Sequence, residues 1–442
     1  MKVVDGLRDY ASVRLVGPAA LRVQRWGNEW RARAGSGWDS EHLAPPLRLA
    51  ARGRELVARH WLEGRYANRN RKVAWVTSGA PVELLHALGY FTVYPENHGA
   101  ICGAARVAVE LSCEAENAGY SRDLCSYART DLGSLFSGRT PVGRLPRPDL
   151  LFACTNICQT VLYWYRVLAH HLHVPLVLID TPFVYFETAP DHAVEYVRRQ
   201  LEAAVPELER IAGRRLDLDR LREAGRLSRE ASHLWMQIME RNVRRPAPIS
   251  VVDQFTLMAP VVEMRGEPAT VDFYAAMLKE VDGRIAAGVS AVRPERHRVL
   301  WDNLPIWYRL RHLAEMLGAG GVALVASTYT NAWGELAELI DPEQPFESMA
   351  RTYLYPILNR GAGHKLATMR RMVEQYSIDG VLLHSDRSCK PYSIGQLDQR
   401  ERLARETDVP AMLLEADHND SRCYSEAQIA NRVAAFLETL ER

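Results

Sequence analysis

The sequence has no long apolar run, few lysines and no excess of either charge. No apolar stretch approaches the roughly 20 residues that a membrane-spanning helix needs, and the first residues, MKVVDGLRDYASVRLVG, lack the apolar centre of a signal peptide. The formal net charge of the 442 residues is +1 and only five of them are lysine, so no basic surface for nucleic acid is expected. We therefore expect a cytoplasmic protein that binds neither membrane nor nucleic acid.

Common cofactor motifs are missing as well. No GxxxxGK[ST] occurs, which argues against ATP binding by this chain, and GAGG (318–321) precedes an expected strand, the wrong order for a dinucleotide-binding turn. No CxxC pair occurs, although four-cysteine zinc sites are usually built from two such pairs. The seven cysteines are odd in number and dispersed, unlike a secreted disulfide framework, so we expect reduced thiols.

Eight apolar segments alternate with helical patterns, which indicates parallel sheets covered on both faces. The length suits two domains. We predict an α/β protein with two doubly wound, flavodoxin- or Rossmann-like parallel-sheet domains and an N-terminal helical region. The expected boundaries are 1–70 for the helical region, 71–230 for the first α/β domain, and 231–442 for a helical insert with the second α/β domain. The expected strands lie in RKVAWVTSG, FTVYPENHG, RPDLLFACTN, VPLVLIDTPF, RHRVLWDNLPIW, GGVALVAST, IDGVLLHSD and VPAMLLEAD.

Polar residues gather where these strands are expected to end, which is where open parallel sheets bind ligands. Cys125, Cys158 and Cys389 lie there or at the starts of helices, where thiolates are stabilised electrostatically. A metal cluster assembled across a crevice is one interpretation of these dispersed thiols, and buried structural cysteines are the other. The other residues at strand ends are Ser78, Glu96, Asn97, His98, residues 154–157, Asp180, Thr181, residues 384–388, Glu415, Asp417, Asn419 and Asp420.

Four motifs in this sequence resemble one enzyme family. DLCSYARTDLG, CTNICQTVLYWY, HSDRSCKPYSIGQ and EADHNDSRCYSEAQIANRVAAFLE are similar, in the same order, to the 2-hydroxyacyl-CoA dehydratases and ATP-dependent benzoyl-CoA reductases, and the similarity runs from about residue 72 to the end. In that family each of two related subunits holds an iron–sulfur cluster through three cysteines. The resemblance implies that Cys125, Cys158 and Cys389 bind three irons of a [4Fe–4S] cluster, whose fourth iron lacks a protein thiolate.

The resemblance also implies a substrate side. Ser78 would hydrogen-bond the thioester carbonyl and stabilise a ketyl radical anion, while Glu96 would protonate the departing hydroxyl or act as base. The structural alternatives are a helix N-cap for Ser78 and a turn residue for Glu96. His98 is a weaker acid–base candidate. NRGAGHKLATMRR could offer His364 and Lys365 to a CoA phosphate, although a solvated helix cap is the simpler interpretation.

The implied activity is the loss of water from a 2-hydroxyacyl-CoA after one-electron activation, so we expect an iron–sulfur lyase. The alternatives are a benzoyl-CoA reductase subunit, an electron-relay partner subunit, a relative that has lost its cluster, and a double-cubane protein. A larger cluster would recruit further cysteines, which are otherwise expected to be structural: Cys102, Cys113, Cys154 and Cys423. The implied partners are a related cluster-bearing subunit in a heterodimer, an ATP-hydrolysing iron–sulfur activator, and an acyl-CoA substrate.

Overall fold

Two four-stranded parallel sheets form the framework of the computed structural model, which describes residues 11–33 and 39–441. The first sheet has the strand order β2-β1-β3-β4 and the second has β6-β5-β7-β8. The two halves thus repeat one order, which is that of flavodoxin-like sheets. The strands are β1 (Val73–Val76), β2 (Phe91–Val93), β3 (Leu150–Cys154), β4 (Leu176–Ile179), β5 (His297–Asp302), β6 (Val322–Ser327), β7 (Gly380–Asp386) and β8 (Ala411–Ala416).

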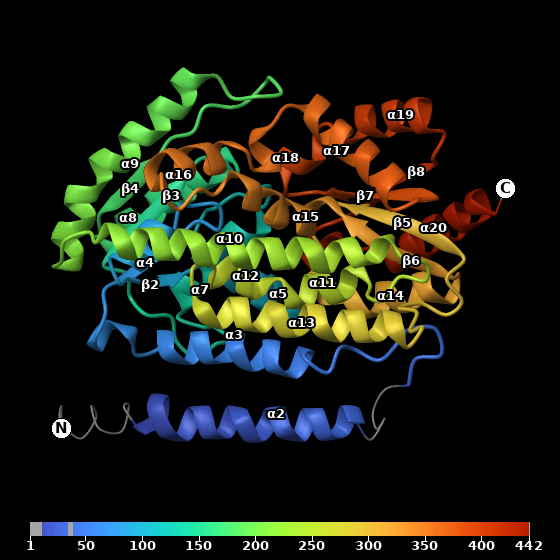
Figure 1. Cartoon of the computed structure of the whole chain (residues 1–442), viewed down its shortest axis with the longest axis horizontal. Helices are drawn as coiled ribbons and strands as arrows, with labels where there is room; N and C mark the ends of the chain where they lie inside the picture. Colours follow the sequence, from blue (N-terminus) through green and yellow to red (C-terminus); the bar gives the residue numbers. More distant parts are fainter. Residues whose placement is uncertain (1–10, 34–38, 442) are drawn as a thin grey trace.

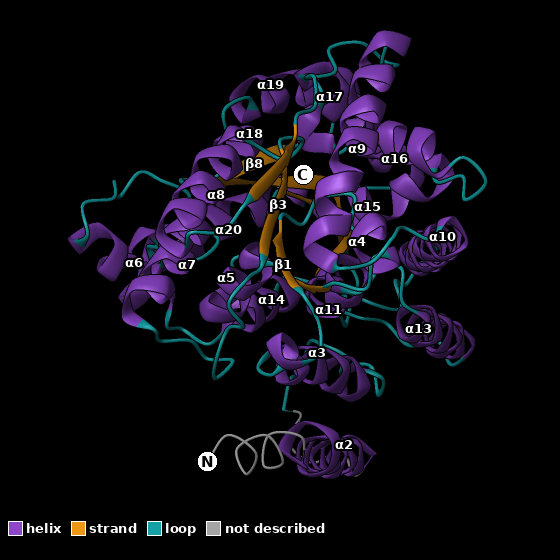
Figure 2. Cartoon of the chain, turned by 90° about the vertical axis from the view of Figure 1, so that its left-hand side faces the viewer, coloured by secondary structure: helices purple, strands orange, loops and turns teal. Residues whose placement is uncertain are grey.

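Helices cover both faces of the first sheet. Successive residues of a strand point to opposite faces, so Ala74 and Phe152 pack into one core and Trp75 and Leu151 into another. Figure 2 shows the strands in the middle of the molecule with helices around them. The helices of this half are α4 (Glu83–Ala87), α5 (Pro95–Ala104), α6 (Ala108–Asn117), α7 (Ser126–Ser137), α8 (Gln159–Leu172) and α9 (Asp191–Ala212).

The second sheet is enclosed in the same way, because Trp301 and Leu382 face one core while Leu300 and Leu383 face another. Its helices are α14 (Leu310–Ala319), α15 (Thr328–Glu335), α16 (Pro345–Leu354), α17 (Ala362–Gln375), α18 (Lys390–Ser393), α19 (Gln396–Thr407) and α20 (Glu426–Leu440). One of them, α16, packs on α9 and completes the core of the first half.

Long helices connect the two halves. The helix α10 runs across the molecule and contacts α4 of the first half and α15 of the second (Figure 1). At the N-terminal side, α3 packs on the insert and α2 lies outside α3 (Figure 1). The insert comprises α10 (Leu218–Glu240), α11 (Val251–Leu257), α12 (Ala259–Glu263) and α13 (Pro268–Ala286), and the N-terminal helices are η1 (Ser12–Val16), α2 (Gly17–Arg33), α3 (Ala50–Gly64) and the 3-10 turn η2 (Ala67–Arg69).

The predicted fold class is confirmed, since all eight expected strands form and pair in parallel. The N-terminal helices are present too, although positions 1–10 and 34–38 of the predicted helical region lie outside the described residues. The domain boundaries at 70 and 230 stay predictions. In FTVYPENHG the strand ends at Val93 and a helix begins at Pro95, because proline suits the first turn of a helix. No helix in the described part of the chain is long and apolar enough to cross a bilayer.

Candidate active site

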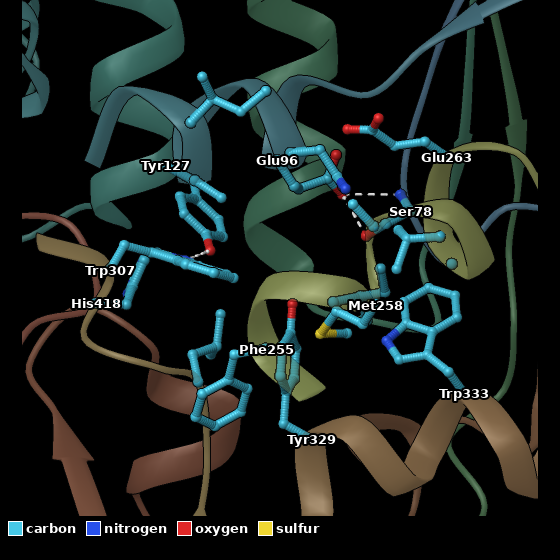
Figure 3. Close-up of a pocket in the computed structure, with 18 of the residues that line it drawn as sticks. Ser78, Glu96, Tyr127, Phe255, Met258, Glu263, Trp307, Tyr329, Trp333 and His418 are labelled. Carbon is cyan, nitrogen blue, oxygen red and sulfur yellow. Dashed lines mark hydrogen bonds between the residues drawn. The ribbon is translucent and has the colours of Figure 1, made fainter. Parts of the chain in front are cut away.

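A cavity of about 650 Å³ lies between the two halves, and Figure 3 shows many of its lining side chains. Six of the residues singled out in the sequence line it together: Ser78, Glu96, Asn97, Cys125, Cys158 and Cys389. They come from the carboxyl ends of β1, β2, β3 and β7 and from the start of α7. Residues up to 311 positions apart in the chain therefore share one site, at the sheet edge where ligands of this fold class bind.

The Ser78 and Glu96 side chains form a pair at the end of the first sheet (Figure 3). Ser78 donates two hydrogen bonds to Glu96 Oε1, from its backbone N–H at 3.1 Å and from its hydroxyl at 3.3 Å. The Arg265 guanidinium donates to the Ser78 carbonyl at 3.2 Å and to the Ala80 carbonyl at 2.6 Å, which fixes the turn after β1. Gly79 is needed in this turn, because a Cβ there would lie 2.7 Å from the Asn156 Oδ1 atom.

Glu96 is poised to exchange a proton near neutral pH. Its side chain is buried, and burial raises its pKa from 4.5 to about 7, although the hydrogen bonds from Ser78 oppose the shift. A group that titrates near the working pH can both donate and accept a proton during a reaction. Buried carboxyls with this property are typical of functional sites.

The three cavity-lining cysteines occupy equivalent local positions. Cys125 is the N-cap of α7, Cys158 is the N-cap of α8, and Cys389 is the N-cap of α18. The positive end of a helix dipole favours a negatively charged group at this position. Each thiol is thus presented by the start of a helix, in a loop after a strand for Cys158 and Cys389 and between two helices for Cys125.

The same three thiols influence one another electrostatically. Burial and the charge of Cys125 raise the pKa of Cys158 to about 12. Burial, the Asp386 carboxylate and the charges of Cys125 and Cys158 raise the pKa of Cys389 well above its usual range. Thiolates at these positions would repel one another, and a metal centre would offset that repulsion because its positive charge balances the thiolates that it coordinates. This set of donors could therefore hold a metal cluster.

A buried ionic network joins two of the cysteine-bearing turns. Asp417 accepts hydrogen bonds of 2.6 Å from the hydroxyls of Ser126 and Ser388, which follow Cys125 and precede Cys389. His418 donates to Asp386 at 2.7 Å and to the Ser126 hydroxyl oxygen at 2.9 Å. Although burial disfavours the charge, Asp386 and Asp417 raise the pKa of His418 well above its usual value, so the ring is an imidazolium.

The sequence indicates only part of this network. Asp386 and Asp417 stand at strand ends in the sequence, but His418 is not distinguished there, although it follows an apolar strand in the same way. Asp386, Asp417 and His418 are close enough to hold a cation themselves. Their carboxylates already accept hydrogen bonds from the imidazolium and two serines, so an ion-pair network explains them.

Three further sequence candidates, His98, His364 and Lys365, do not line the cavity. His98 is fully buried and contacts Thr140 at 2.8 Å and Cys102 at 3.5 Å. Lys365 is buried over the ring of Tyr392, and burial lowers the pKa of the neighbouring His364 to about 4. The proposed roles of these three residues stay predictions. In the described part of the chain none of the other four cysteines lines the cavity: Cys102, Cys113, Cys154 and Cys423.

Much of the cavity wall comes from elements that the sequence did not connect with the site. One face of α3 contributes Arg54, Val57, Ala58, Trp61 and Arg65, which recur at helical spacing. The insert contributes a second apolar wall from α11 and α12. The amphipathic pattern of these helices is visible, but nothing in a single sequence says which core or cavity an apolar face will meet. The wall residues of the insert include Phe255, Leu257, Met258, Val262 and Glu263.

Comparison with known proteins identifies the family. The family model described as "2-hydroxyglutaryl-CoA dehydratase, D-component" matches residues 77–440. The chain is 31% identical to the (R)-2-hydroxyisocaproyl-CoA dehydratase alpha subunit of Clostridioides difficile, over 87% of this chain and 96% of that relative. It is 32% identical to the (R)-phenyllactyl-CoA dehydratase alpha subunit of Clostridium sporogenes, over 84% and 90%, and 26% identical to a benzoyl-CoA reductase subunit of Thauera aromatica, over 88% and 94%.

The chain belongs to the 2-hydroxyglutaryl-CoA dehydratase D-component family. This result confirms the resemblance that the four cysteine-containing motifs indicated. It also agrees with the expectation of a lyase of the dehydratase type, since dehydratase subunits occur among the relatives. A benzoyl-CoA reductase subunit, the expected alternative, occurs among them too. Because the family model starts at residue 77, α3 and its part of the cavity wall lie outside the matched region.

Proposed function

We propose that this chain is a cluster-bearing and substrate-binding subunit of a 2-hydroxyacyl-CoA dehydratase. The observation that supports this most strongly is that one cavity is lined both by three thiols and by the Ser78–Glu96 pair. Cys125, Cys158 and Cys389 would hold a [4Fe–4S] cluster. Such a cluster, when bound, supplies one electron at low potential and an iron position open to a substrate oxygen.

The residues of the chain would then handle the acyl thioester. The β-hydrogen of a 2-hydroxyacyl-CoA is not acidic, but it becomes so once the thioester carbonyl is reduced to a ketyl radical anion and the hydroxyl leaves. The Ser78 hydroxyl would donate to the carbonyl oxygen, where negative charge develops. Glu96, with its pKa near 7, would give its proton to the departing hydroxyl and afterwards accept the β-proton, so water and the 2-enoyl thioester leave and the electron is recovered.

The proposal includes partners. The relatives are each named as one subunit of an enzyme, the two dehydratases as alpha subunits, so a related second subunit is expected in a heterodimer with this chain. Because the sequence has no GxxxxGK[ST] motif, ATP-driven delivery of the electron is assigned to a separate iron–sulfur activator. The benzoyl-CoA reductase alternative has one specific support, the reductase subunit among the relatives, and in that branch two electrons stay in the aromatic ring.

Anaerobic purification followed by iron and sulfide analysis tests the cluster. The wild-type chain should contain about four irons and four sulfides, and Cys158→Ser should lose them. Cys154→Ser is the matched control, because Cys154 lies four positions earlier, is fully buried in β3 and does not line the cavity. An iron-free wild type, or a Cys158→Ser protein with undiminished iron, would refute the assignment.

Turnover assays then separate the two branches of the family. A dehydratase converts a 2-hydroxyacyl-CoA to a 2-enoyl-CoA with catalytic amounts of reduced activator, since the electron is recovered. A reductase consumes two electrons for each benzoyl-CoA. Electron consumption in proportion to product would therefore favour the reductase branch.

A further inference from the structure

A second buried carboxyl lines the cavity beyond the Ser78–Glu96 pair. Glu263, the last residue of α12, is 1% exposed, and Figure 3 shows it on the Ser78 side of Glu96, away from Tyr127 and His418. The proposed chemistry of the thioester does not use it. Two residues further along the chain, Arg265 donates to the Ser78 carbonyl, so α12 is tied to the turn that bears Ser78.

Glu263 has two polar neighbours in the cavity wall, Trp61 and Asn97. Burial raises the pKa of Glu263 to about 8, and the Asn97 amide and Trp61 indole oppose this shift. The carboxyl is therefore mainly neutral at pH 7. Trp61 and Asn97 act on Glu263 as hydrogen-bonding neighbours, but among the described residues no hydrogen bond of ordinary geometry reaches Glu263 Oε2 or leaves Trp61 Nε1, although both atoms are buried.

Buried polar atoms without partners are uncommon in native proteins, and each needs an explanation. Here the two unpartnered atoms belong to one corner of an otherwise apolar cavity, which is how binding sites combine an apolar wall with a few orienting polar groups. An indole N–H can only donate, whereas a neutral carboxyl can donate and accept. A ligand group that both accepts and donates would satisfy them together.

We propose that Trp61, Asn97 and Glu263 form a subsite that binds a neutral amide or hydroxyl group of the acyl-CoA. This inference rests on the proposed function and extends it to substrate recognition. The ligand group would accept from the Trp61 indole and hydrogen-bond with the Glu263 carboxyl. A carboxylate on the ligand is disfavoured, because burying its charge in this largely apolar cavity costs more than burying a neutral group.

Two parts of an acyl-CoA have the required chemistry. One is an amide of the pantetheine arm, which every acyl-CoA shares, and the other is a polar group on the acyl chain itself. Two probes that lack the 2-hydroxyl and so cannot be dehydrated distinguish them. They are 3-phenylpropanoyl-CoA and 3-(4-hydroxyphenyl)propanoyl-CoA, which differ only in one hydroxyl on the acyl group.

Anaerobic titration calorimetry of the holoenzyme with both probes tests the subsite. Trp61→Phe removes the indole N–H together with the five-membered ring but keeps an aromatic side chain, Glu263→Met removes the carboxyl at similar volume, and Glu263→Gln keeps a group that donates and accepts. Trp61→Phe and Glu263→Met should each weaken binding by about tenfold, and Glu263→Gln by less than about threefold. If the pantetheine amide is the ligand group, the substitutions weaken the binding of both probes alike. If the acyl group supplies it, they weaken the binding of the hydroxylated probe only.

The outcomes are separable from failure of the proposed function. If the wild type binds neither probe, the subsite is refuted for these ligands, and the turnover assays decide the acyl-CoA function separately. If the wild type binds a probe but Trp61→Phe and Glu263→Met bind both probes within twofold of it, the subsite alone is wrong. Trp61→Phe, which keeps an aromatic side chain, decides the question should Glu263→Met fail to fold.

Discussion

Replacing Glu96 by glutamine should stabilise the protein in a pH-dependent way. Burial raises the pKa of Glu96 from 4.5 to about 7, so ionising it costs more in the folded than in the unfolded chain. Glutamine keeps an Oε1 that can accept the same two hydrogen bonds from Ser78, at 3.1 and 3.3 Å. The substitution thus removes the titration and preserves the contacts.

The sign and size follow from proton linkage. Below pH 4.5 Glu96 is protonated in both states, and the wild type has no penalty relative to the variant. Between pH 4.5 and about 7 the unfolded chain has released the proton that the folded chain keeps, so wild-type stability falls by about 1.4 kcal/mol per pH unit. Above pH 7 the difference levels off at about 3 kcal/mol in favour of Glu96→Gln.

Denaturant unfolding of both proteins under nitrogen, at pH values from 5 to 8, measures this difference. Contributions shared by the two proteins, including any bound cluster, cancel in the comparison. Glu110→Gln, at an exposed carboxyl on α6, controls for the substitution itself. If the stability difference between wild type and Glu96→Gln stays constant over this range, burial does not raise the pKa of Glu96. The proton-transfer role would then lose its physical basis.

Three further substitutions test the geometry of the site. Ser78→Ala should lower kcat by about 10²–10³ with little change in the thermal midpoint, since it removes one donor to the reacting carbonyl, and steady-state rates will check it. Gly79→Ala should destabilise the fold by about 1–3 kcal/mol, because the new Cβ would approach Asn156 Oδ1 to 2.7 Å. The control Gly283→Ala, in a helix with open space around it, should stabilise the fold slightly. Thermal melts compare the two variants. Asp417→Asn should cost about 1.5–3 kcal/mol, because an amide cannot accept from both serine hydroxyls; an unchanged melt would contradict the bridging role.

Much of the fold could be predicted because the strands of a buried parallel sheet have a strong sequence pattern. Segments such as VAWV and LLFAC are apolar at every position, since both faces of their sheet are covered. The same logic located the site, because polar residues directly after such strands must meet at one sheet edge. Ser78, Glu96, Cys158 and Cys389 were found in this way, and all of them line the cavity.

The parts that could not be predicted depend on long-range packing. Trp61 and Glu263 belong to helices whose apolar faces could have met any core, and only the folded chain brings α3 and α12 to the cavity. His418 follows a strand as Asp417 does, but its charge depends on two aspartates, one of which is 32 positions away. The burial of Trp61 and Glu263 and the charge of His418 depend on contacts between segments far apart in the chain, which a single sequence does not reveal.

The repeated strand order explains why the cavity has two chemically different sides. In each half a cysteine caps the helix that follows the third strand, Cys158 after β3 and Cys389 after β7, so the two halves present thiols to each other across the cavity. The residues after the first strands of the two halves differ. In the first half Ser78 follows β1 and Glu96 follows β2. In the second half Asn303 follows β5, and its amide donates a hydrogen bond to the His384 carbonyl at 2.7 Å. The Ser78–Glu96 pair therefore belongs to one half alone, while the three thiols come from both. Loss of contact between the halves would disrupt the thiol set but leave the Ser78–Glu96 hydrogen bonds intact.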